Sequence, residues 1–148
     1  MRMLQFLGVI LTALALAPGC AHLFALPNKL ALDQDAYFTA QAIYRGWSLL
    51  GIILIAALAA DFGLAIGMRR QPGPCSLAAG GAVCLALTLV VFFLWTYPAN
   101  QATANWTAVP DNWAALRRQW EYSHAANAVL TFAALCLVTL SALRWRPG

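Results

Sequence analysis

Charge is scarce in this sequence, and its scarcity excludes most classes of soluble protein. Only 9% of the 148 residues are charged, whereas 62% are hydrophobic. A soluble domain usually has about 25% charged residues. The nine basic residues form no stripe of the kind that binds nucleic acid. We therefore expect no nucleic-acid partner and a protein whose main solvent is lipid.

Cysteine is also sparse and has no redox pattern. The four cysteines form no C-x-x-C pair, which argues against a thiol-redox enzyme. They lie in or beside apolar stretches, so we interpret them as packing residues: Cys20, Cys75, Cys84 and Cys136. A leader cleaved before Cys20 fits poorly, because the apolar run continues to Leu26, beyond the usual core of about 7–15 residues. We expect this first run to be retained.

Long apolar runs are what the sequence has in abundance. They cover Met3–Leu26, Trp47–Met68, Ser76–Tyr97 and Ala125–Leu143. Each has roughly the ~20 residues with which a helix crosses a ~30 Å hydrocarbon layer. Runs so uniformly apolar exclude barrel strands, which alternate over about 10 residues. The sequence therefore predicts an all-α fold, in which residues 1–148 form one integral membrane four-helix bundle in the lipid bilayer.

The basic residues indicate how the four spans are oriented. Alternating sides place Arg2, Arg69, Arg70, Arg144 and Arg146 together, and Lys29, Arg45, Arg117 and Arg118 opposite them. The first group outnumbers the second five to four and includes the amino terminus. Because Lys and Arg collect on the cytoplasmic side, we expect a multi-pass protein of the inner or plasma membrane with both termini cytoplasmic.

The two outer connections, residues 27–46 and 98–124, hold most of the polar residues. Each begins with a proline, Pro27 or Pro98, which we interpret as the end of the preceding helix. Each then forms a short amphipathic helix that leads into the next span. The short inner connection Arg69–Cys75 is a turn.

Each outer connection carries a polar stripe at helical spacing. In the first the residues are Tyr37, Gln41, Arg45 and Ser48, and in the second Trp113, Arg117, Trp120, Glu121, His124, Asn127 and Thr131. Residues three or four apart share a helix face, and polar groups that continue into a span face the bundle interior or a wet cavity. We interpret Trp47, Trp95, Trp106 and Tyr97 as an interfacial aromatic belt rather than as part of a site.

Two histidines are the candidate catalytic bases, because imidazole exchanges a proton near neutral pH. His124 lies in the second stripe. His22 follows Pro18 and Gly19, where a proline kink opens space in the first span. Arg117 or Arg118 would stabilise a developing phenolate. The candidate substrate-binding residues are Tyr37, Gln41, Arg45, Asn100, Trp120, Glu121 and Asn127.

Three further features favour structural roles. Glu121 and His124 have the E-x-x-H spacing of di-iron bundles, but such sites need two copies. We therefore expect no metal, and a Glu121 that pairs with His124 or Arg117. Asp61, inside the second span, is interpreted as a hydrogen-bonded residue. The Gly63-x-x-x-Gly67 motif predicts close helix packing inside the bundle and leaves a homodimer open.

Two short motifs resemble the anthrone oxygenase-like family of small four-helix membrane proteins. They are Pro98-Ala99-Asn100 and Trp120-x-x-x-His124. The first outer segment resembles a subgroup of the family through His22, Leu26-Pro27-Asn28-Lys29, Tyr37-Phe38 and Gln41-x-Ile43-Tyr44-Arg45-Gly46-Trp47. The resemblance implies oxidation of anthrones to anthraquinones without metal or flavin, with Asn100, Trp120 and His124 at the site. The sequence departs from the family at Asn127, where arginine is common.

The sequence therefore predicts a membrane enzyme that admits a flat, apolar aromatic molecule from lipid. Such a molecule would be an anthrone, a phenol or a quinol, and no cofactor is expected. A non-catalytic binding module, or a subunit of a larger membrane assembly, is the alternative.

Overall fold

The structure is a computed structural model that describes residues 1–147, and over that range it contains helices and turns but no strand. It confirms the predicted all-α bundle. The helices are α1 (Arg2–Ala31), α2 (Gln34–Gln41), α3 (Gly51–Gly67), α4 (Pro72–Val91), α5 (Tyr97–Ala102) and α6 (Trp113–Arg144). Two 3₁₀ turns, Ala42–Tyr44 and Trp47–Leu50, precede α3, and a π-helical turn, Phe92–Thr96, joins α4 to α5.

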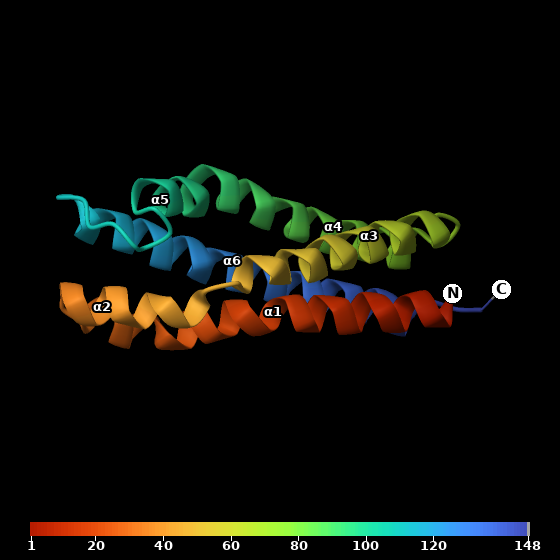
Figure 1. Ribbon diagram of the computed structural model, residues 1–148. Coiled ribbons are helices and arrows are strands. Elements are labelled where there is room, and N and C mark those ends of the chain that lie inside the picture. The colour runs from red at the N-terminus through yellow and green to blue at the C-terminus, as the bar shows by residue number, and fades with distance from the viewer. Residues whose placement is uncertain (148) are drawn as a thin grey trace.

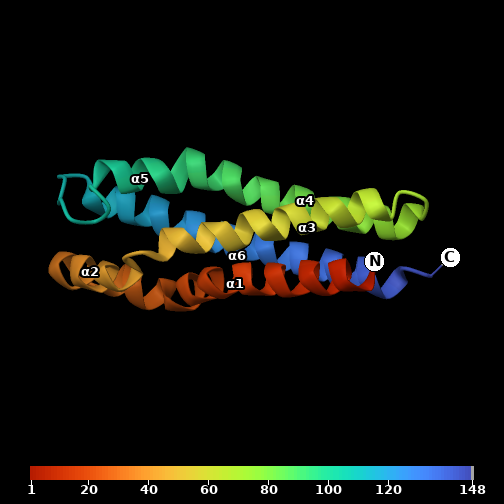
Figure 2. The ribbon, with the colours of Figure 1, turned by 45° about the vertical axis from the view of Figure 1, so that its right-hand side comes forward.

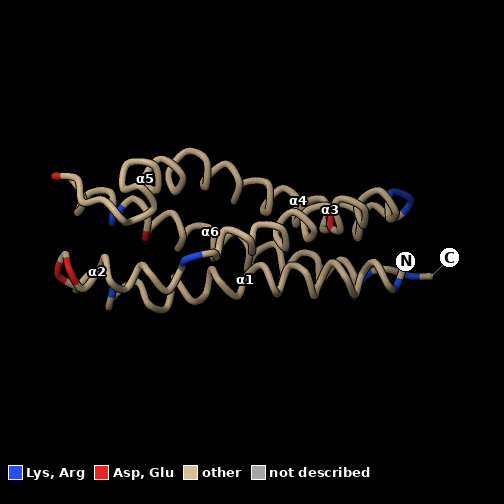
Figure 3. The backbone as a smooth tube through the Cα atoms, in the orientation of Figure 1, with Lys and Arg blue, Asp and Glu red and all other residues tan. Residues whose placement is uncertain are grey.

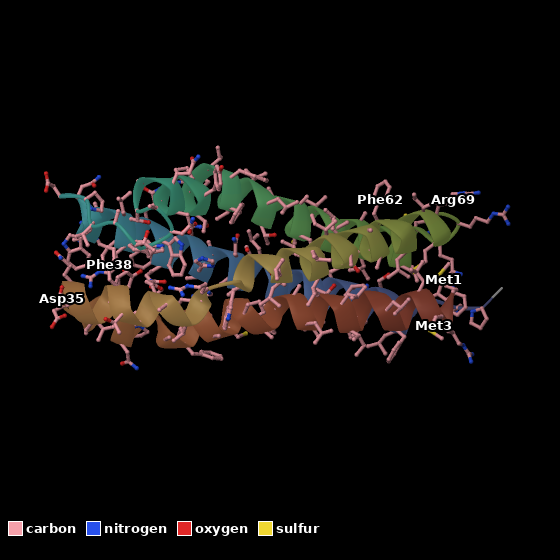
Figure 4. All side chains as sticks on the ribbon, viewed as in Figure 1. Met1, Met3, Asp35, Phe38, Phe62 and Arg69 are labelled. Atoms are coloured by element: carbon pink, nitrogen blue, oxygen red, sulfur yellow. The ribbon has the colours of Figure 1, made fainter. Side chains whose placement is uncertain are left out.

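Four helical stretches are long and apolar enough to cross a membrane. They are Arg2–Ala31, Trp47–Gly67, Pro72–Ala102 and Trp113–Arg144. Large apolar side chains on their outer faces are exposed, including Phe24, Phe62 and Leu143 at 76, 61 and 75%. Figure 4 shows Phe62 pointing away from the bundle. A lipid environment accounts for such faces, so this is a multi-pass membrane protein.

The four long stretches form a closed ring. Helix α1 packs against α3 and α6, and α4 packs against the same two helices. Figures 1 and 2 show both chain termini at one end of the bundle, while α2 folds back beside the end of α1 at the other. We call these the basic end and the aromatic end. Among the residues that the structure describes, Lys and Arg occur at both ends, but the basic end has no acidic residue beside them; the acidic residues, apart from one in α3, lie at the aromatic end (Figure 3).

Labelled side chains locate the two ends. Met1, Met3 and Arg69 lie at the basic end, and Asp35 and Phe38 lie at the aromatic end (Figure 4). Helix α2 begins where Asp33 Oδ1 accepts a hydrogen bond of 2.9 Å from the Ala36 amide, as expected of an N-cap. This cap fixes the point at which the chain turns back from α1.

Small residues close the bundle in its basic half. A Cβ on Gly8 would lie 2.8 Å from Leu64 Cδ1, and one on Gly81 would lie 3.2 Å from Asp61 Oδ2. The helices approach closely at Gly8 and Gly81 because these positions carry no side chain. At Gly63-x-x-x-Gly67, a Cβ on Gly63 would lie 3.6 Å from Leu4 Cδ2 and one on Gly67 would meet only the Met1 side chain, so the close helix packing predicted from this motif stays a prediction.

The expectation that Pro27 ends the first helix is wrong. Helix α1 continues through Pro27 to Ala31. The missing N–H costs one helical hydrogen bond, but one further half-turn buries Lys29, whose ammonium lies 2.7 Å from a Glu121 carboxylate oxygen. The ion pair offsets the local cost of the proline.

Pro98 does not end its helix either. It is the second residue of α5, which continues directly from the π-helical turn Phe92–Thr96. The Tyr97 amide donates to the Phe92 carbonyl, five residues back. This wider turn already departs from the α-helical hydrogen-bond pattern before the proline, as π-bulges do.

The first outer connection is not the continuous helix that its polar stripe predicts. It breaks at Gly46, whose φ of +86° is left-handed and suits glycine. Arg45 is therefore exposed at the break, whereas Tyr37 and Gln41 on α2 are buried. The second stripe is continuous, as predicted, because α6 runs unbroken from Trp113 to Arg144.

Candidate functional site

The aromatic half of the bundle contains a cavity of about 880 Å³. Helices α3 and α4 lie together near the basic end and separate toward the aromatic end (Figures 1 and 2). One wall is apolar and includes Leu54, Ile55, Leu89 and Phe92. Ile55 and Phe93 line the cavity and are also 53 and 61% exposed, so the cavity reaches the lipid-facing surface beside α3 and the π-helical turn.

The opposite wall holds both histidines. The His22 ring on α1 stacks on the His124 ring on α6, with centroids 4.1 Å apart and planes 22° apart. The backbones of α1 and α6 approach closely next to the two rings: a Cβ added to Gly19 would lie only 3.2 Å from Ala128 Cα. Pro18, Gly19 and His22 all line the cavity.

Aromatic rings enclose the histidine pair. Tyr44 lies 4.3 Å from His22, centroid to centroid, and Trp120 lies 4.2 Å from His124. Trp47 adds an edge-to-face contact with His22 at 5.6 Å. Such contacts are worth about 0.5–1.5 kcal/mol each beyond area burial. They fix the plane of both imidazoles.

A buried ion pair lies behind His22. Lys29 Nζ is 2.7 Å from Glu121 Oε2, and the two side chains are 6 and 0% exposed. The Tyr37 hydroxyl donates to Glu121 Oε1 at 2.9 Å. Both carboxylate oxygens are therefore paired, which a buried charge requires.

Lys29 also sets the hydrogen bonding of His22. Its Nζ lies 3.2 Å from His22 Nδ1. An ammonium has three donors and no acceptor, so Lys29 donates and Nδ1 must be unprotonated. The one proton of the neutral His22 ring is then on Nε2.

From the sequence alone, Lys29 is a topology charge and part of a family motif, with no predicted role at the site. Its functional signal was its position seven residues, two helical turns, after His22. That signal depends on the helix continuing through Pro27, which the proline rule had excluded.

The two tyrosines near Glu121 are held in their protonated form. Burial, and then the Glu121 carboxylate, raise the pKa of the Tyr37 phenol above its ordinary value. The same two causes, in the same order, raise the pKa of Tyr44. At neutral pH both tyrosines therefore serve as neutral hydroxyl donors.

Asn100 organises the tryptophans around the cavity. Its Oδ1 accepts hydrogen bonds from the indole nitrogens of Trp120 at 2.8 Å and Trp106 at 3.2 Å. Trp106 ends a run of three left-handed residues that begins at Ala104. Each left-handed residue costs of order 1 kcal/mol or more. A hydrogen bond from the Trp106 amide to Thr103 Oγ1 helps to stabilise this run.

The predicted site residues separate into three groups. Seven line the cavity: His22, Gln41, Arg45, Asn100, Trp120, His124 and Asn127. Tyr37, Glu121 and Arg117 lie outside its lining, in the surrounding polar network. Arg118 is exposed and lines a shallow surface depression with Trp95 and Tyr122.

Arg117 and Arg118 are therefore not placed to stabilise a phenolate in the cavity. Arg117 donates to the Leu32 carbonyl at 2.7 Å and lies over the Trp113 ring at 4.7 Å. It ties α6 to the end of α1. Arg118 is the next residue, about 100° further around the helix, and its side chain therefore faces away from the cavity.

The E-x-x-H residues point to different partners. Glu121 pairs with Lys29 and Tyr37, rather than with Arg117 or His124, and His124 stacks on His22. Within residues 1–147 no three His, Cys, Asp or Glu side chains are grouped as a metal site would require. Asp61 is fully buried in the basic half, where Thr12 Oγ1 donates to it at 3.4 Å, consistent with a structural hydrogen bond.

No protein-family model, curated protein or solved structure matches this chain. Its function must therefore be argued from the cavity.

Proposed function

We propose that this protein is a membrane enzyme that oxidises a flat, apolar aromatic substrate in the cavity of its aromatic half. The supporting observation is the stacked His22–His124 pair on the wall of a cavity that reaches the lipid-facing surface. Substrates of the anthrone, phenol or quinol class fit this combination. They partition into lipid and carry an acidic C–H or O–H.

The dimensions of the cavity support a ligand of this kind. Its volume of about 880 Å³ lies within the range of about 300–1,000 Å³ that is usual for small-molecule sites. The apolar wall on α3 and α4 would contact the ring system. The polar groups of α1, α2 and α6 would face its oxygen substituents.

His124 is the better-placed general base. His22 Nδ1 is engaged by Lys29, whereas the His124 ring forms no hydrogen bond within residues 1–147 and lines the cavity. For an anthrone, His124 removes a proton from the ring methylene, and the resulting enolate gives electrons to dioxygen. Overall the carbon loses two hydrogens and gains one oxygen atom, and the second oxygen atom leaves as water.

The test is oxygen uptake by purified protein with anthrone and simple quinols. Replacing a general base typically costs 10²–10⁴-fold in rate, so His124→Ala should lose about 100-fold or more. Val129→Ala, on the lipid-exposed face of the same helix, is the matched control and should keep full activity. Equal turnover by His124→Ala would remove this assignment.

A non-catalytic binding module is the second candidate. Both imidazoles are packed among Tyr44, Trp47 and Trp120, which suits a rigid recognition wall. Saturable binding of an aromatic ligand with no oxygen uptake for any substrate would favour this candidate.

We also propose that the basic end faces the cytoplasm, which places both termini inside an inner or plasma membrane. The arginines at that end support this orientation through the positive-inside rule. The cavity then lies in the outer leaflet. Reporter fusions after Gly73 should be cytoplasmic, and fusions after Val109 should be on the far side; the reverse result would contradict the orientation.

A further inference from the structure

Gln41 is a buried amide that lacks hydrogen-bond partners. It ends α2, lines the cavity and is 6% exposed. Within residues 1–147, neither its Oε1 nor its Nε2 meets a partner in hydrogen-bond geometry. The Gln41 amide lies close enough to Tyr37 to lower the pKa of its phenol, but it does not reach hydrogen-bond geometry. The Tyr37 hydroxyl donates its proton to Glu121, so it does not satisfy Gln41 Oε1.

Asn127 repeats this pattern on the facing helix. It lies on α6, three residues after His124, and lines the cavity. Its Oδ1 is buried without a partner among the described residues. An amide oxygen only accepts, so a hydroxyl or N–H donor in the cavity would pair it.

Leaving such groups unpaired is costly. A buried donor or acceptor without a partner costs about 1–3 kcal/mol, and native proteins pair more than about 90% of buried polar groups. Asn100 and Glu121, beside the same cavity, have partners. Three of the buried atoms without a hydrogen-bond partner in residues 1–147 belong to the cavity lining, where a ligand would meet them: Gln41 Oε1, Gln41 Nε2 and Asn127 Oδ1. Others, such as Arg117 Nε and Asp61 Oδ1, lie outside the lining.

We infer that Gln41 is a specificity-determining residue that binds an oxygen substituent of the ligand, with Asn127 binding a second one. Gln41 offers an N–H donor and a carbonyl acceptor, and therefore pairs fully with a hydroxyl group. Asn127 Oδ1 accepts from a hydroxyl but not from an ether. The inference rests on the proposed function and adds to it that the preferred ligands carry free hydroxyl groups at two positions.

The experiment compares 2,6-dihydroxynaphthalene with 2,6-dimethoxynaphthalene. Binding to the purified protein is followed through quenching of tryptophan fluorescence, since Trp47, Trp106 and Trp120 line the cavity. The wild type should bind the diol about 10-fold more tightly, equivalent to about 1.4 kcal/mol. In Gln41→Leu this preference should fall below about 3-fold, chiefly through weaker binding of the diol.

Asn127→Leu is the second variant and should also reduce the preference for the diol. It keeps the inference open to test if Gln41→Leu fails to fold. Thr39→Val, an exposed position on α2 outside the cavity lining, is the matched control and should keep the wild-type ratio. The methoxy groups are bulkier than hydroxyl groups in every variant, so comparing the ratio of diol affinity to dimethoxy affinity between variants cancels this steric effect.

The two possible failures are distinguishable. If the wild type binds both compounds, and its preference is the same in Gln41→Leu and Asn127→Leu, the inference fails and the proposed function survives. If the wild type binds neither this pair nor anthrone, the cavity is not an aromatic site, and both proposals fail.

Discussion

The two halves of the bundle use opposite means to hold the same four helices together. In the basic half, Gly8 and Gly81 let the backbones approach, and Leu64 and Val138 fill the core. In the aromatic half, large rings and a buried ion pair surround a cavity, although Gly19 keeps α1 close to α6 there. Glycines thus allow close packing in the basic half, whereas aromatic rings and a charged pair line a cavity in the aromatic half.

Buried charge shows the same contrast. Asp61 in the basic half has one hydrogen bond, of 3.4 Å, and its Oδ1 has no partner within residues 1–147. Glu121 in the aromatic half has both oxygens paired, at 2.7 and 2.9 Å. A buried ion pair requires such pairing, so the aromatic half is built around a paired charge and the basic half is not.

Breaking that charge pair should have the largest effect on stability. Glu121→Gln leaves the Lys29 ammonium buried without a counter-charge, and removal of one partner of a buried pair costs about 3–5 kcal/mol. We expect this loss in the free energy of unfolding in detergent micelles. Asp35→Asn, at an exposed acid of α2, should change it by less than about 0.5 kcal/mol.

A double variant sharpens this result. Lys29→Met with Glu121→Gln removes both charges, and it should recover much of the loss because a buried pair can often be replaced by uncharged residues. A double variant as unstable as Glu121→Gln would show that the ion pair is not the cause.

Filling the tight half should have the next largest effect. Gly8→Ala places a Cβ 2.8 Å from Leu64 Cδ1 and 3.0 Å from Asp61 Oδ1, and overpacking typically costs about 1–3 kcal/mol. Ligand affinity in the cavity should not change. Gly51→Ala is the control, because its Cβ meets nothing within 4 Å, and it should be neutral or up to about 1 kcal/mol more stable.

Alkaline pH should destabilise the aromatic half through Tyr37. Its pKa is raised in the folded state by burial and by Glu121, while the Gln41 amide and then Arg117 act in the opposite direction. Above the unfolded value of about 10, the folded protein holds a proton that the unfolded chain loses. Stability is therefore complete below about pH 10 and falls as the pH rises, by up to about 1.4 kcal/mol per unit.

The measurement is the free energy of unfolding between pH 8 and pH 11 for the wild type and Tyr37→Phe. The difference between them should shrink above about pH 10, because the phenylalanine variant has no phenol to titrate there. A difference that stays constant would show that the Tyr37 phenol titrates normally in the folded protein.

Much of the fold follows from apolar run length, but the ends of the helices do not. Four runs of membrane-spanning length require helices. The prediction that Pro27 and Pro98 end their helices is wrong, because a proline ends a helix only when nothing offsets the lost hydrogen bond. At Pro27 the Lys29–Glu121 pair offsets it, and at Pro98 a π-helical turn changes the bonding first.

Helical spacing identified side chains that share a face but not the partners they meet. It grouped Trp120, His124, Asn127 and Thr131, which all line the cavity. It did not distinguish Arg117 from Arg118, since which of two neighbours is exposed depends on the packing of α6 against α1. It also did not pair Lys29 with Glu121, 92 positions apart in the sequence.

The smallest change expected is the position of one proton in the aromatic half. The chain has only two histidines, so ¹⁵N NMR of histidine-labelled protein should resolve both rings, and His124→Gln assigns them. We expect His22 to show an unprotonated, hydrogen-bonded Nδ1 and a protonated Nε2, because Lys29 can only donate to Nδ1. In Lys29→Met with Glu121→Gln, the Nδ1 signal should lose its hydrogen-bond shift and the other tautomer should become populated. A protonated Nδ1 in the wild type would mean that Lys29 pairs with Glu121 alone, and the charged network would then end before it reaches the stacked imidazoles.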